Sequence, residues 1–483
     1  MKLVDLFNIV DINFNVKIKG ITCNPKKIKK NYVFVCPSRE YKKYLNESVQ
    51  VNNTGFYIKK ENICVIISQT MKRVLIFHRN PQEIYKKIVS KFYKFKYPKY
   101  IAAITGTNGK TSVVEFCRQI WQSVDYSAIS VGTLGISINN NNSRKYNSSF
   151  LTTPNEEDLY TILRDINNNN NKDIEHYLAL EASSHGIDQY RIHGLEVTSA
   201  AFTNFSQDHL DYHQNISEYF ETKKRLFYEI LSRERTVILN ADIGKYYDEL
   251  FKIAKERSNK IITYGRKIDS CIALIRQIPT QNGQYLTIKI YDKLYENIFF
   301  PVLGKFQAHN LLCAIGIVIS SGVKFQRICI DKLASPPGRM QKVLPFAFVD
   351  YAHTPCALRQ ALLSLKWHFI KKKIILVFGC GGDRDKKKRI EMGKIAKRYA
   401  DKVIVTDDNP RNEDPAKIRY DILLHCSNAI EIGNRREAIK KGVDIASNEN
   451  MILLVAGRGH EKFQIIKNKT FALSDVEMLK EVE

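Results

Sequence analysis

A loop that can bind phosphate lies near residue 106, where Thr105-Gly-Thr-Asn-Gly-Lys-Thr-Ser112 follows an apolar stretch. Glycines let the backbone curl so that successive N–H groups, and the start of a following helix, face phosphate oxygens. In such a loop Lys110 reaches the β- and γ-phosphates, and the hydroxyl of Thr111 binds Mg²⁺. The full pattern G-x-x-x-x-G-K-S/T is not met, because Ile104 stands at its first glycine position. The segment predicts an ATP site formed by Gly106, Thr107, Asn108, Gly109, Lys110, Thr111 and Ser112.

Two further segments carry side chains that can bind a metal ion beside such a loop. Leu180-Glu181-Ala182-Ser183 ends one apolar run, and Asn204-Phe-Ser-Gln-Asp-His209 follows another. The carboxyl ends of parallel strands open onto one edge of a sheet, where ligands bind. There Glu181 and His209 could coordinate Mg²⁺ together with Thr111 and phosphate oxygens. Taken singly, each is equally well a capping acid or a surface histidine, but their convergence beside a phosphate loop indicates a metal site.

Alternating apolar runs and helical stretches must position these residues. Short apolar segments separated by basic turns fill the first 95 residues, and from Tyr100 strand-like runs alternate with helices, which predicts a mostly parallel, helix-covered sheet. Ala334-Ser-Pro-Pro-Gly338 breaks this pattern, and a second alternating series follows. We therefore predict an α/β protein of three domains: a small N-terminal domain (residues 1–95), a central ATP-binding domain (96–333) and a C-terminal Rossmann-like domain (334–483). The predicted strands lie at 32–36, 64–67, 74–77, 100–106, 176–183, 200–206, 236–241, 260–265, 346–351, 373–379, 402–407 and 451–457.

The composition is that of a globular protein with a large excess of basic residues. The chain has 483 residues, 44% of them hydrophobic, and a formal net charge of +25. The lysines are spread along the whole chain, whereas a nucleic-acid site needs clustered charge, so we expect no specific nucleic-acid binding. The ten cysteines are scattered without metal-like spacing, no apolar run approaches the roughly 20 residues of a membrane span, and the start lacks a signal peptide. We expect a cytoplasmic monomer.

Nine motifs together resemble a known family. In order along the chain they are TGTNGKTS, LEASSHGIDQYR, TNFSQDHLDYH, GKFQAHN, PPGRMQ, VDYAHTP, GCGGDRDKKKR, DDNPR and AGRGHE. Over residues 100 to 465 the chain is similar to the Mur ligases. The resemblance implies three domains that bind UDP, ATP and an amino acid. It also implies an ATP-driven ligation, in which an acyl phosphate forms on an acceptor carboxylate and is attacked by an amine.

The order of the motifs is most similar to that of the family members that add meso-diaminopimelate. Those enzymes extend the D-Glu carboxylate of UDP-N-acetylmuramoyl-L-Ala-D-Glu during peptidoglycan precursor synthesis. The resemblance implies Lys110 as a catalytic cation, Glu181 and His209 as Mg²⁺ ligands, and Lys223 as a carbamylated lysine. A carbamate replaces a cation with an anionic oxygen ligand that suits Mg²⁺. The alternative is a solvated helix lysine, and spacing favours Lys223 over Lys224.

The resemblance also assigns residues to the nucleotide and to the acceptor. His309 and Asn310 resemble a segment that contacts adenine, and Arg339 and Asp350 resemble C-terminal groups that close on the phosphate and ribose of ATP. An arginine arriving from another domain would complete the site on closure and keep water from the acyl phosphate. Hydroxyls, an amide and a guanidinium suit a ligand with pyrophosphate, peptide and carboxylate groups. The muramoyl-dipeptide positions are Thr152, Thr153, Ser183, Gln189, Arg191 and Lys223.

The amino-acid pocket follows two predicted strands of the C-terminal domain. Meso-diaminopimelate carries an ammonium and a carboxylate at both ends, so its distal end needs a cation and an acid. Arg411 offers a planar fork for the carboxylate, and Glu461 with Asp408 offers counter-charges for the ammonium. Lysine has no distal carboxylate and would leave Arg411 unpaired. The alternative is that Arg411 forms a loop salt bridge with Asp407 or Asp414. The predicted pocket residues are Arg389, Asp408, Asn409, Pro410, Arg411, Gly457 and Glu461.

The N-terminal domain departs from the family, and other functions remain open. Where an Asp-Ser-Arg motif usually helps to hold UDP, this chain reads Asn24-Pro25-Lys26, so we assign no uridine contact. The alternatives are a ligase that adds L-lysine, a folylpolyglutamate-synthetase-like ligase, and a non-catalytic basic scaffold that binds nucleic acid. Intact Lys110, Glu181, His209 and Asp350 argue against the scaffold.

Overall fold

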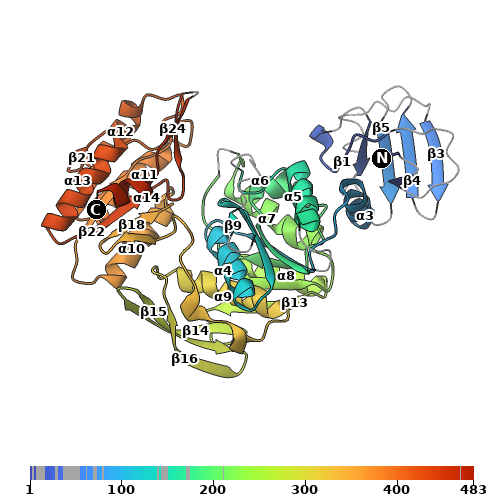
Figure 1. Cartoon of the computed structure of the whole chain (residues 1–483), viewed down its shortest axis with the longest axis horizontal. Coiled ribbons are helices and arrows are strands. Elements are labelled where there is room, and N and C mark those ends of the chain that lie inside the picture. The colour runs from blue at the N-terminus through green and yellow to red at the C-terminus, as the bar shows by residue number, and fades with distance from the viewer. Residues whose placement is uncertain are drawn as a thin grey trace. The chain divides into compact units, whose positions relative to one another are not determined.

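The computed structural model has an α/β fold built on three main sheets (Figure 1). It describes residues 1–2, 5–6, 17–27, 31–35, 55–60, 63–68, 73–78, 81–138, 141–142, 151–169, 174–209, 212–467 and 469–482. The chain forms two compact units. The first comprises Met1–Ala103, Tyr126–Ala200 and Thr222–Arg235, and the second comprises Ile104–Asp125, Ala201–Glu221 and Thr236–Glu483.

The N-terminal sheet has five strands, and it confirms the three strands predicted there. Its order is β1 (Gly20–Thr22), β2 (Tyr32–Val35), β5 (Arg73–His78), β4 (Ile63–Ser68) and β3 (Gly55–Lys60). The first three pair in parallel, and β4 pairs antiparallel with both of its neighbours. Helix α3 (Pro81–Tyr93) follows β5. The predicted loop after β2, residues 36–41, lies outside the described residues.

The central sheet has eleven strands in the order β16-β15-β14-β13-β12-β11-β6-β10-β7-β8-β9. Its predicted strands appear as β6 (Tyr100–Thr105), β10 (His176–Glu181), β11 (Ser199–Phe202), β12 (Thr236–Asn240) and β13 (Lys260–Gly265). The other strands are β7 (Ser127–Gly132), β8 (Gly135–Ile138), β9 (Asn141–Asn142), β14 (Ile272–Thr280), β15 (Gly283–Ile290) and β16 (Lys293–Phe300).

This sheet is mixed rather than mostly parallel. The strands β14, β15 and β16 pair antiparallel, and so do β7, β8 and β9. The reason is the short connections: only two residues separate β14 from β15, and two separate β15 from β16. A two-residue turn can join only antiparallel strands, because a parallel pair needs a long crossover.

The helices of the central region include α4 (Lys110–Ser123), which begins at the predicted position. The others are α5 (Glu156–Asn169), α6 (Ser184–Asp188), α7 (Ile216–Arg225), α8 (Lys245–Glu256) and α9 (Gln307–Ser320). Helix α9 is apolar around most of its surface, because it packs between α4 and the strands β12 to β14 (Figure 1). Among the described residues no single helix is long and apolar enough to cross a membrane. One bent pair of segments, α9 and residues 325–332, is together long and apolar enough by length and composition alone.

The C-terminal sheet has the order β17 (Gln341–Leu344), β18 (Ala347–Asp350), β22 (Ile452–Ala456), β19 (Ile374–Phe378), β20 (Lys402–Val405) and β21 (Ile430–Glu431). From β18 to β21 neighbouring strands are parallel, as predicted. Helices α10 (Pro355–His368), α11 (Lys387–Tyr399) and α12 (Pro415–Leu423) cover one face, while α13 (Arg435–Asn448) and α14 (Asp475–Glu481) cover the other.

Strand alternation explains these two layers. In β19, Leu376 and Phe378 pack with α10 to α12, whereas Ile375 and Val377 pack with α13 and α14. A strand buried on both faces is apolar at every position, and this accounts for the uninterrupted run Ile374–Phe378. A hairpin of β23 (Phe463–Ile466) and β24 (Lys469–Ala472) completes this region.

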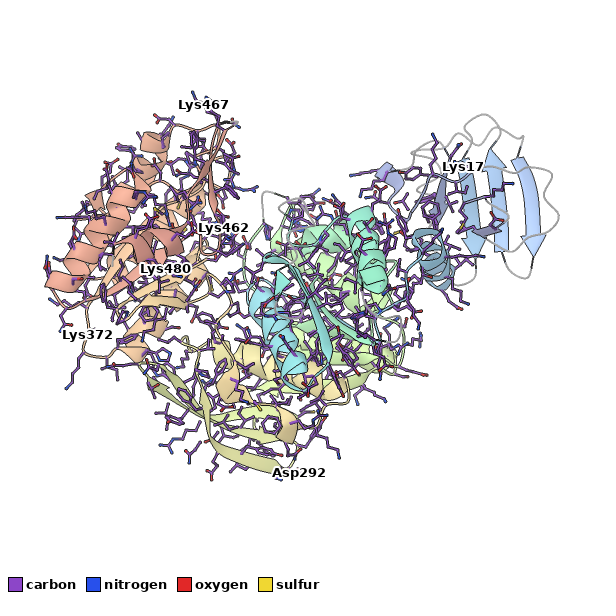
Figure 2. All side chains as sticks on the ribbon, in the orientation of Figure 1. Lys17, Asp292, Lys372, Lys462, Lys467 and Lys480 are labelled. Carbon is purple, nitrogen blue, oxygen red and sulfur yellow. The ribbon has the colours of Figure 1, made fainter. Side chains whose placement is uncertain are left out.

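The basic residues are spread over the fold rather than gathered in one element. The lysines labelled in Figure 2 are Lys17 near the N-terminus, Lys372 between α10 and β19, Lys462 and Lys467 around β23, and Lys480 in α14. The net charge therefore indicates a general positive field, which attracts anionic substrates.

A buried carboxyl group joins the N-terminal segment to α5 within the first compact unit. Thr22 Oγ1 donates to Glu156 Oε2 at 3.0 Å, and the thiol of Cys23 lies 3.9 Å from Glu156 Oε1. The neighbouring amide of Asn24 donates to the carbonyl oxygen of Gln189 at 3.1 Å. Burial raises the pKa of Glu156 to about 8, although Thr22 and Lys27 act in the opposite direction. This carboxyl group is therefore protonated near neutral pH.

We expect Glu156→Gln to flatten the dependence of stability on pH. Because the folded-state pKa of Glu156 lies above its unfolded value of 4.5, the contribution of this group to stability is fully present below pH 4.5 and is lost as pH rises towards 8. Relative to the variant, the wild-type chain should lose on the order of a few kcal/mol between pH 5 and pH 8. Urea unfolding at several pH values measures this difference. The adjacent exposed Glu157→Gln is the control, and parallel profiles for wild type and Glu156→Gln would contradict the prediction.

Candidate active site

The loop between β6 and α4 has the backbone that phosphate binding requires. Gly106 and Gly109 have φ values of +139° and +86°, which side chains disfavour. A Cβ atom on Gly106 would lie 2.0 Å from Thr203 Oγ1, so this position has room only for glycine. The ammonium group of Lys110 donates to the carbonyl oxygens of Gly106 and Thr107 at 2.9 and 2.8 Å. The predicted catalytic lysine thus folds back over its own loop.

Residues after β11 hold this loop in place, and the sequence analysis did not single them out. Asn204 accepts a hydrogen bond from Asn108 N and donates to Asn108 O, both at 2.9 Å. Its carbonyl oxygen accepts from Thr107 N at 2.9 Å, and Thr203 Oγ1 donates to Asn108 O at 2.6 Å. Asn204 is the second residue of the motif TNFSQDH, and its place just after a strand beside β6 was the available signal.

The two residues predicted to contact adenine differ in their surroundings. Asn310 is buried, and its side-chain oxygen would be 2.3 Å from a Cβ on Gly109, so it packs against the phosphate loop. Its amide donates to Gln307 Oε1 at 2.8 Å. His309 is partly exposed, and its Nε2 lies 3.3 Å from Asp242 Oδ2. His309 and Asp242 are therefore the better placed pair to meet a ligand, whereas Asn310 supports the loop.

Arg339 connects the C-terminal sheet to the start of α4 within the second unit. Its Nη2 donates to Thr111 Oγ1 at 3.1 Å, and its guanidinium lies 4.6 Å from the centre of the Tyr351 ring. Asp350 ends β18 and accepts from Met340 N at 2.7 Å. Burial raises the pKa of Asp350 to about 6, although the charge of Arg339 opposes the shift. The arrangement places a cation at the hydroxyl group predicted to bind Mg²⁺, and a buried carboxyl group beside it.

In the first unit, Glu181 ends β10 with its carboxylate held by a threonine that the sequence analysis missed. Thr133 donates through its backbone N–H to Glu181 Oε1 at 2.8 Å and through its hydroxyl to Oε2 at 3.2 Å. Glu181 is 1% exposed, and a Cβ on Gly132 would lie 2.2 Å from its Oε1. A buried carboxylate with fixed orientation suits a cation ligand. The β7–β8 turn that supplies Thr133 lies in a hairpin that the analysis did not predict.

The residues predicted to contact the muramoyl-dipeptide share one hydrogen-bond network, apart from Lys223. Thr153 Oγ1 donates to Glu181 O at 2.7 Å and lies 2.9 Å from Ser183 Oγ. Arg191 donates to Thr153 O at 2.7 Å and to Gln189 Oε1 at 2.6 Å. Thr152 Oγ1 lies 3.3 Å from the hydroxyl of Thr133. The structure therefore brings these five residues together around Glu181, and their role as substrate contacts stays a prediction.

Lys223 and His209 have features typical of functional positions. Lys223 lies in α7 with 1% exposure, whereas Lys224 is half-buried, so Lys223 is not a solvated helix lysine. His209 has a φ of +54°, an uncommon backbone conformation for a residue with a side chain. Glu181 and Lys223 belong to the first unit, and Thr111 and His209 to the second. The described part of the chain contains no group of three or more His, Cys, Asp or Glu residues arranged for a metal, so the shared Mg²⁺ site stays a prediction.

The predicted amino-acid pocket is built from the loops after β20 and β22. Asn409 donates to Glu461 Oε2 at 2.9 Å, and the hydroxyl of Tyr351 lies 3.5 Å from Glu461 Oε1. Gly457 has a φ of +113°, and a Cβ there would lie 2.7 Å from Asp408 Oδ2. Burial, followed by the charge of Asp408, raises the pKa of Glu461. Two acids thus converge, and an ammonium group would relieve their repulsion.

Arg411 does not form the salt bridge that was its alternative explanation. Its Nη1 donates to Gly382 O at 2.8 Å, and among the ion pairs between described residues it takes part in none. Its φ is +49°, and the hairpin of β23 and β24 fixes its backbone through bonds from Arg411 N to Ile465 O and from Lys467 N to Arg411 O. An arginine held in this conformation with a carbonyl as its partner has its charge available. Pro410 directly precedes it, and Pro410 O would lie 2.0 Å from a Cβ on Gly382.

Arg389 is placed differently from the rest of the predicted pocket. It is 1% exposed and donates to Glu413 Oε1 at 2.7 Å and to Asp421 Oδ2 at 2.9 Å. Two carboxylates therefore neutralise its charge, and it fastens α11 to α12 and the loop before it. Its contact with a substrate stays a prediction that needs these ion pairs to open.

The fold and these loops define a three-domain α/β protein with a nucleotide-binding loop. Residues 104–318 match the Mur ligase middle domain, and residues 338–459 match the Mur ligase glutamate ligase domain. The UDP-N-acetylmuramoyl-L-alanyl-D-glutamate–2,6-diaminopimelate ligase of Anaplasma marginale is 43% identical over 457 residues, which cover 94% of each chain. The chain belongs to the Mur ligase family.

Solved structures agree with this assignment. That of a UDP-N-acetylmuramoyl-L-alanyl-D-glutamate–2,6-diaminopimelate ligase is 28% identical, has a TM-score of 0.62, and matches 100% of this chain and 98% of its own. The folylpolyglutamate synthase of Mycobacterium tuberculosis, complexed with ADP and AMPPCP, has a TM-score of 0.64 at 18% identity, with 77% of this chain and 92% of that chain covered. The second likeness shows a common fold only.

We expect Asn204→Ala to weaken the binding of Mg·ATP by roughly tenfold, because it removes two hydrogen bonds that fix the loop at Asn108. Titration calorimetry with Mg·ATP measures the change in Kd. Asn282→Ala, on the exposed turn between β14 and β15, is the control. An unchanged Kd in Asn204→Ala would show that the loop keeps its shape without this support.

Proposed function

We propose that this protein uses ATP to join meso-diaminopimelate to the D-Glu carboxylate of UDP-N-acetylmuramoyl-L-Ala-D-Glu, a step of peptidoglycan precursor synthesis. The observation that carries the proposal is Arg411, a guanidinium with a carbonyl partner next to the paired acids Asp408 and Glu461. A substrate end with one carboxylate and one ammonium complements this charge pattern. The similarity to the Anaplasma marginale ligase over 94% of the chain supports the same substrate.

Membership of the family implies ATP and Mg²⁺, and the residues of the loop fit both. The start of α4 offers N–H groups to phosphate oxygens, and the Lys110 ammonium, which donates to the carbonyl oxygens of Gly106 and Thr107, lies at the same loop. Thr111 and Glu181 would hold Mg²⁺, with His209 as a further ligand. The ion would neutralise phosphate charge while the phosphoryl group passes to the carboxylate. Lys110 and Arg339 add two fixed cations, so the transfer depends on position and charge rather than on a protein nucleophile.

We further propose that Lys223 is carbamylated. Lys223 is 1% exposed, and burial disfavours the charged ammonium form of a lysine. Carbamylation turns it into an anionic oxygen ligand and removes that charge conflict. Mass spectrometry under native conditions, with and without bicarbonate, tests for the added carbamate.

The setting that fits this function is a monomer in the cytoplasm, where UDP-linked precursors and ATP are available. Sedimentation analysis tests the monomeric state. The N-terminal segment keeps a role in this proposal through Asn24, whose amide contacts Gln189 O beside the dipeptide network.

A phosphate-release assay with ATP and UDP-N-acetylmuramoyl-L-Ala-D-Glu tests the proposal. Meso-diaminopimelate should support turnover, and L-lysine should support very little. Turnover with lysine alone would favour a lysine-adding ligase, and turnover only with a folate and glutamate would favour the folylpolyglutamate reading. No turnover with any of them, together with salt-sensitive nucleic-acid binding that survives Lys110→Ala, would favour the basic scaffold.

We expect Arg411→Ala to raise the KM for meso-diaminopimelate by about 10- to 100-fold, because a charge-assisted bond to a carboxylate contributes about 1.5–3 kcal/mol. The KM for ATP should stay within twofold of the wild-type value. The variant should then discriminate less between diaminopimelate and lysine, since neither substrate finds a cation. Initial rates of phosphate release measure the KM for diaminopimelate, the KM for ATP and the preference for diaminopimelate over lysine. An unchanged KM for diaminopimelate would show that another cation binds the distal carboxylate.

We expect Thr133→Val to lower kcat by roughly tenfold, because Glu181 loses its hydroxyl partner at Oε2 while shape is kept. Thr133→Ser retains the hydroxyl group and should keep most of the activity. The same assay at saturating substrates measures kcat, and equal rates for the valine and serine variants would contradict the prediction.

A further inference from the structure

Beneath the predicted amino-acid pocket lies a buried group of charged side chains that none of the roles above uses. It consists of Arg435, Arg458 and Asp475, which we call the ionic cluster. Arg458 and Asp475 are 0% exposed and Arg435 is 1% exposed. Charges removed from water are costly unless they are paired and hydrogen-bonded, so a cluster of three requires an explanation.

The first half of the cluster joins two helices to two strand ends. Arg435 begins α13 and forms a two-bond ion pair with Asp475 at the start of α14, with both N···O distances 2.7 Å. The same guanidinium donates to Asp407 O at 3.2 Å and to Ala456 O at 3.1 Å. These carbonyl groups stand where β20 and β22 end. Arg435 therefore fixes the spacing between the two strands whose loops form the pocket.

The second half of the cluster reaches the pocket side chains. Arg458 donates to Asn409 Oδ1 at 2.9 Å, and Asn409 in turn donates to Glu461 Oε2 at 2.9 Å. Arg458 Nη2 donates to Phe463 O at 2.7 Å and to Leu473 O at 3.2 Å. These two carbonyl groups lie at the two ends of the hairpin that fixes Arg411. Asp475 Oδ1, which also pairs with Arg435, lies 4.0 Å from Arg458 Nε, and Glu461 Oε2 lies 3.8 Å from Arg458 Nη1. The guanidinium of Arg458 therefore contacts Asn409, which holds Glu461, and the hairpin that holds the backbone of Arg411.

Ordinary stability does not account for this arrangement well. A buried ion pair is often no more stabilising than apolar residues of the same volume, because desolvation offsets the attraction. A guanidinium offers several donors in fixed directions, so it can set the relative positions of several acceptors. Arg458 uses that property on Asn409 and on two backbone segments of the hairpin. Binding sites need their contact residues held to within about half an ångström by such supports.

We propose that Arg458, held by Arg435 and Asp475, is a positioning residue for amino-acid recognition, which sets Glu461 and Arg411 at the separation that a diamino dicarboxylic acid requires. This inference rests on the proposed function. Arg458 itself touches no substrate. It acts on Glu461 directly, through an ion pair of 3.8 Å, and through Asn409, and it acts on the backbone of Arg411 through the hairpin. Nucleotide binding uses none of these contacts and should be independent of them.

The test compares Arg458→Met with wild type in the phosphate-release assay and in calorimetric titration with meso-diaminopimelate. We expect the KM and the Kd for diaminopimelate to rise at least tenfold, while the KM for ATP and the KM for the UDP-linked acceptor stay within twofold. Arg458→Lys, which keeps the charge and a donor, should recover most of this loss. Arg436→Met is the matched control, because Arg436 joins the same two helices through an exposed ion pair with Glu481.

The outcomes separate positioning from a purely structural role. If Arg458→Met lowers the melting temperature but leaves the KM for diaminopimelate within twofold, or raises all three KM values alike, the proposal is wrong. If this variant does not fold, Arg458→Gln decides by the same criteria, because it keeps a polar donor in the buried position while it removes the charge and the guanidinium fork. Absence of turnover by the wild-type protein would refute the proposed function. The titration still decides on Arg458 in that case, because equal Kd values, or no binding by either protein, would overturn the inference.

Discussion

The phosphate loop after β6 depends on one constraint: a backbone curled around phosphate cannot satisfy its own remaining polar groups. The N–H groups at the start of α4 must be left for the ligand, the backbone groups of Thr107 and Asn108 need other partners, and the glycines supply φ values that other residues avoid. The loop that follows β11 supplies hydrogen-bond partners for these backbone groups. Asn204 bonds both backbone groups of Asn108, and Thr203 adds a second bond to the same carbonyl. The position of the nucleotide therefore rests on a neighbouring strand end rather than on the loop alone.

The C-terminal region solves a related problem with charge. Its pocket loops also follow strand ends, but the ligand they are proposed to bind carries both charge signs, so cations and acids must stand close without cancelling each other. Glu461 and Asp408 face the same space, Arg411 is held apart by the β23–β24 hairpin, and Arg458 lies buried behind them. Buried charges that are already paired can fix the geometry while leaving the pocket charges available.

The sequence predicted the strands and the chemical loops well because both signals are local. A strand buried on two faces is apolar throughout, as at Ile374–Phe378, and a glycine turn before a helix marks the phosphate loop. The antiparallel strands β14 to β16 were missed because their half-exposed faces dilute the apolar pattern. Thr133, Asn204 and Arg458 were missed for another reason. Each contacts a residue far away in the chain, and the chemical type of one residue does not reveal which distant residue it will contact. Asn310 shows the reverse case, since its amide suits a base but packs against Gly109.

Tyr351 packs between the proposed nucleotide and amino-acid ends of this region. Its ring lies against the guanidinium of Arg339, which reaches Thr111 of the phosphate loop, and its hydroxyl lies beside Glu461 of the pocket. The backbone permits this only because Gly338 and Gly459 approach so closely that a Cβ on Gly338 would lie 2.2 Å from His460 N. A larger residue at either glycine would separate Arg339 from the pocket loop. The two proposed sites are therefore neighbouring parts of one packed unit that share the contacts of Tyr351.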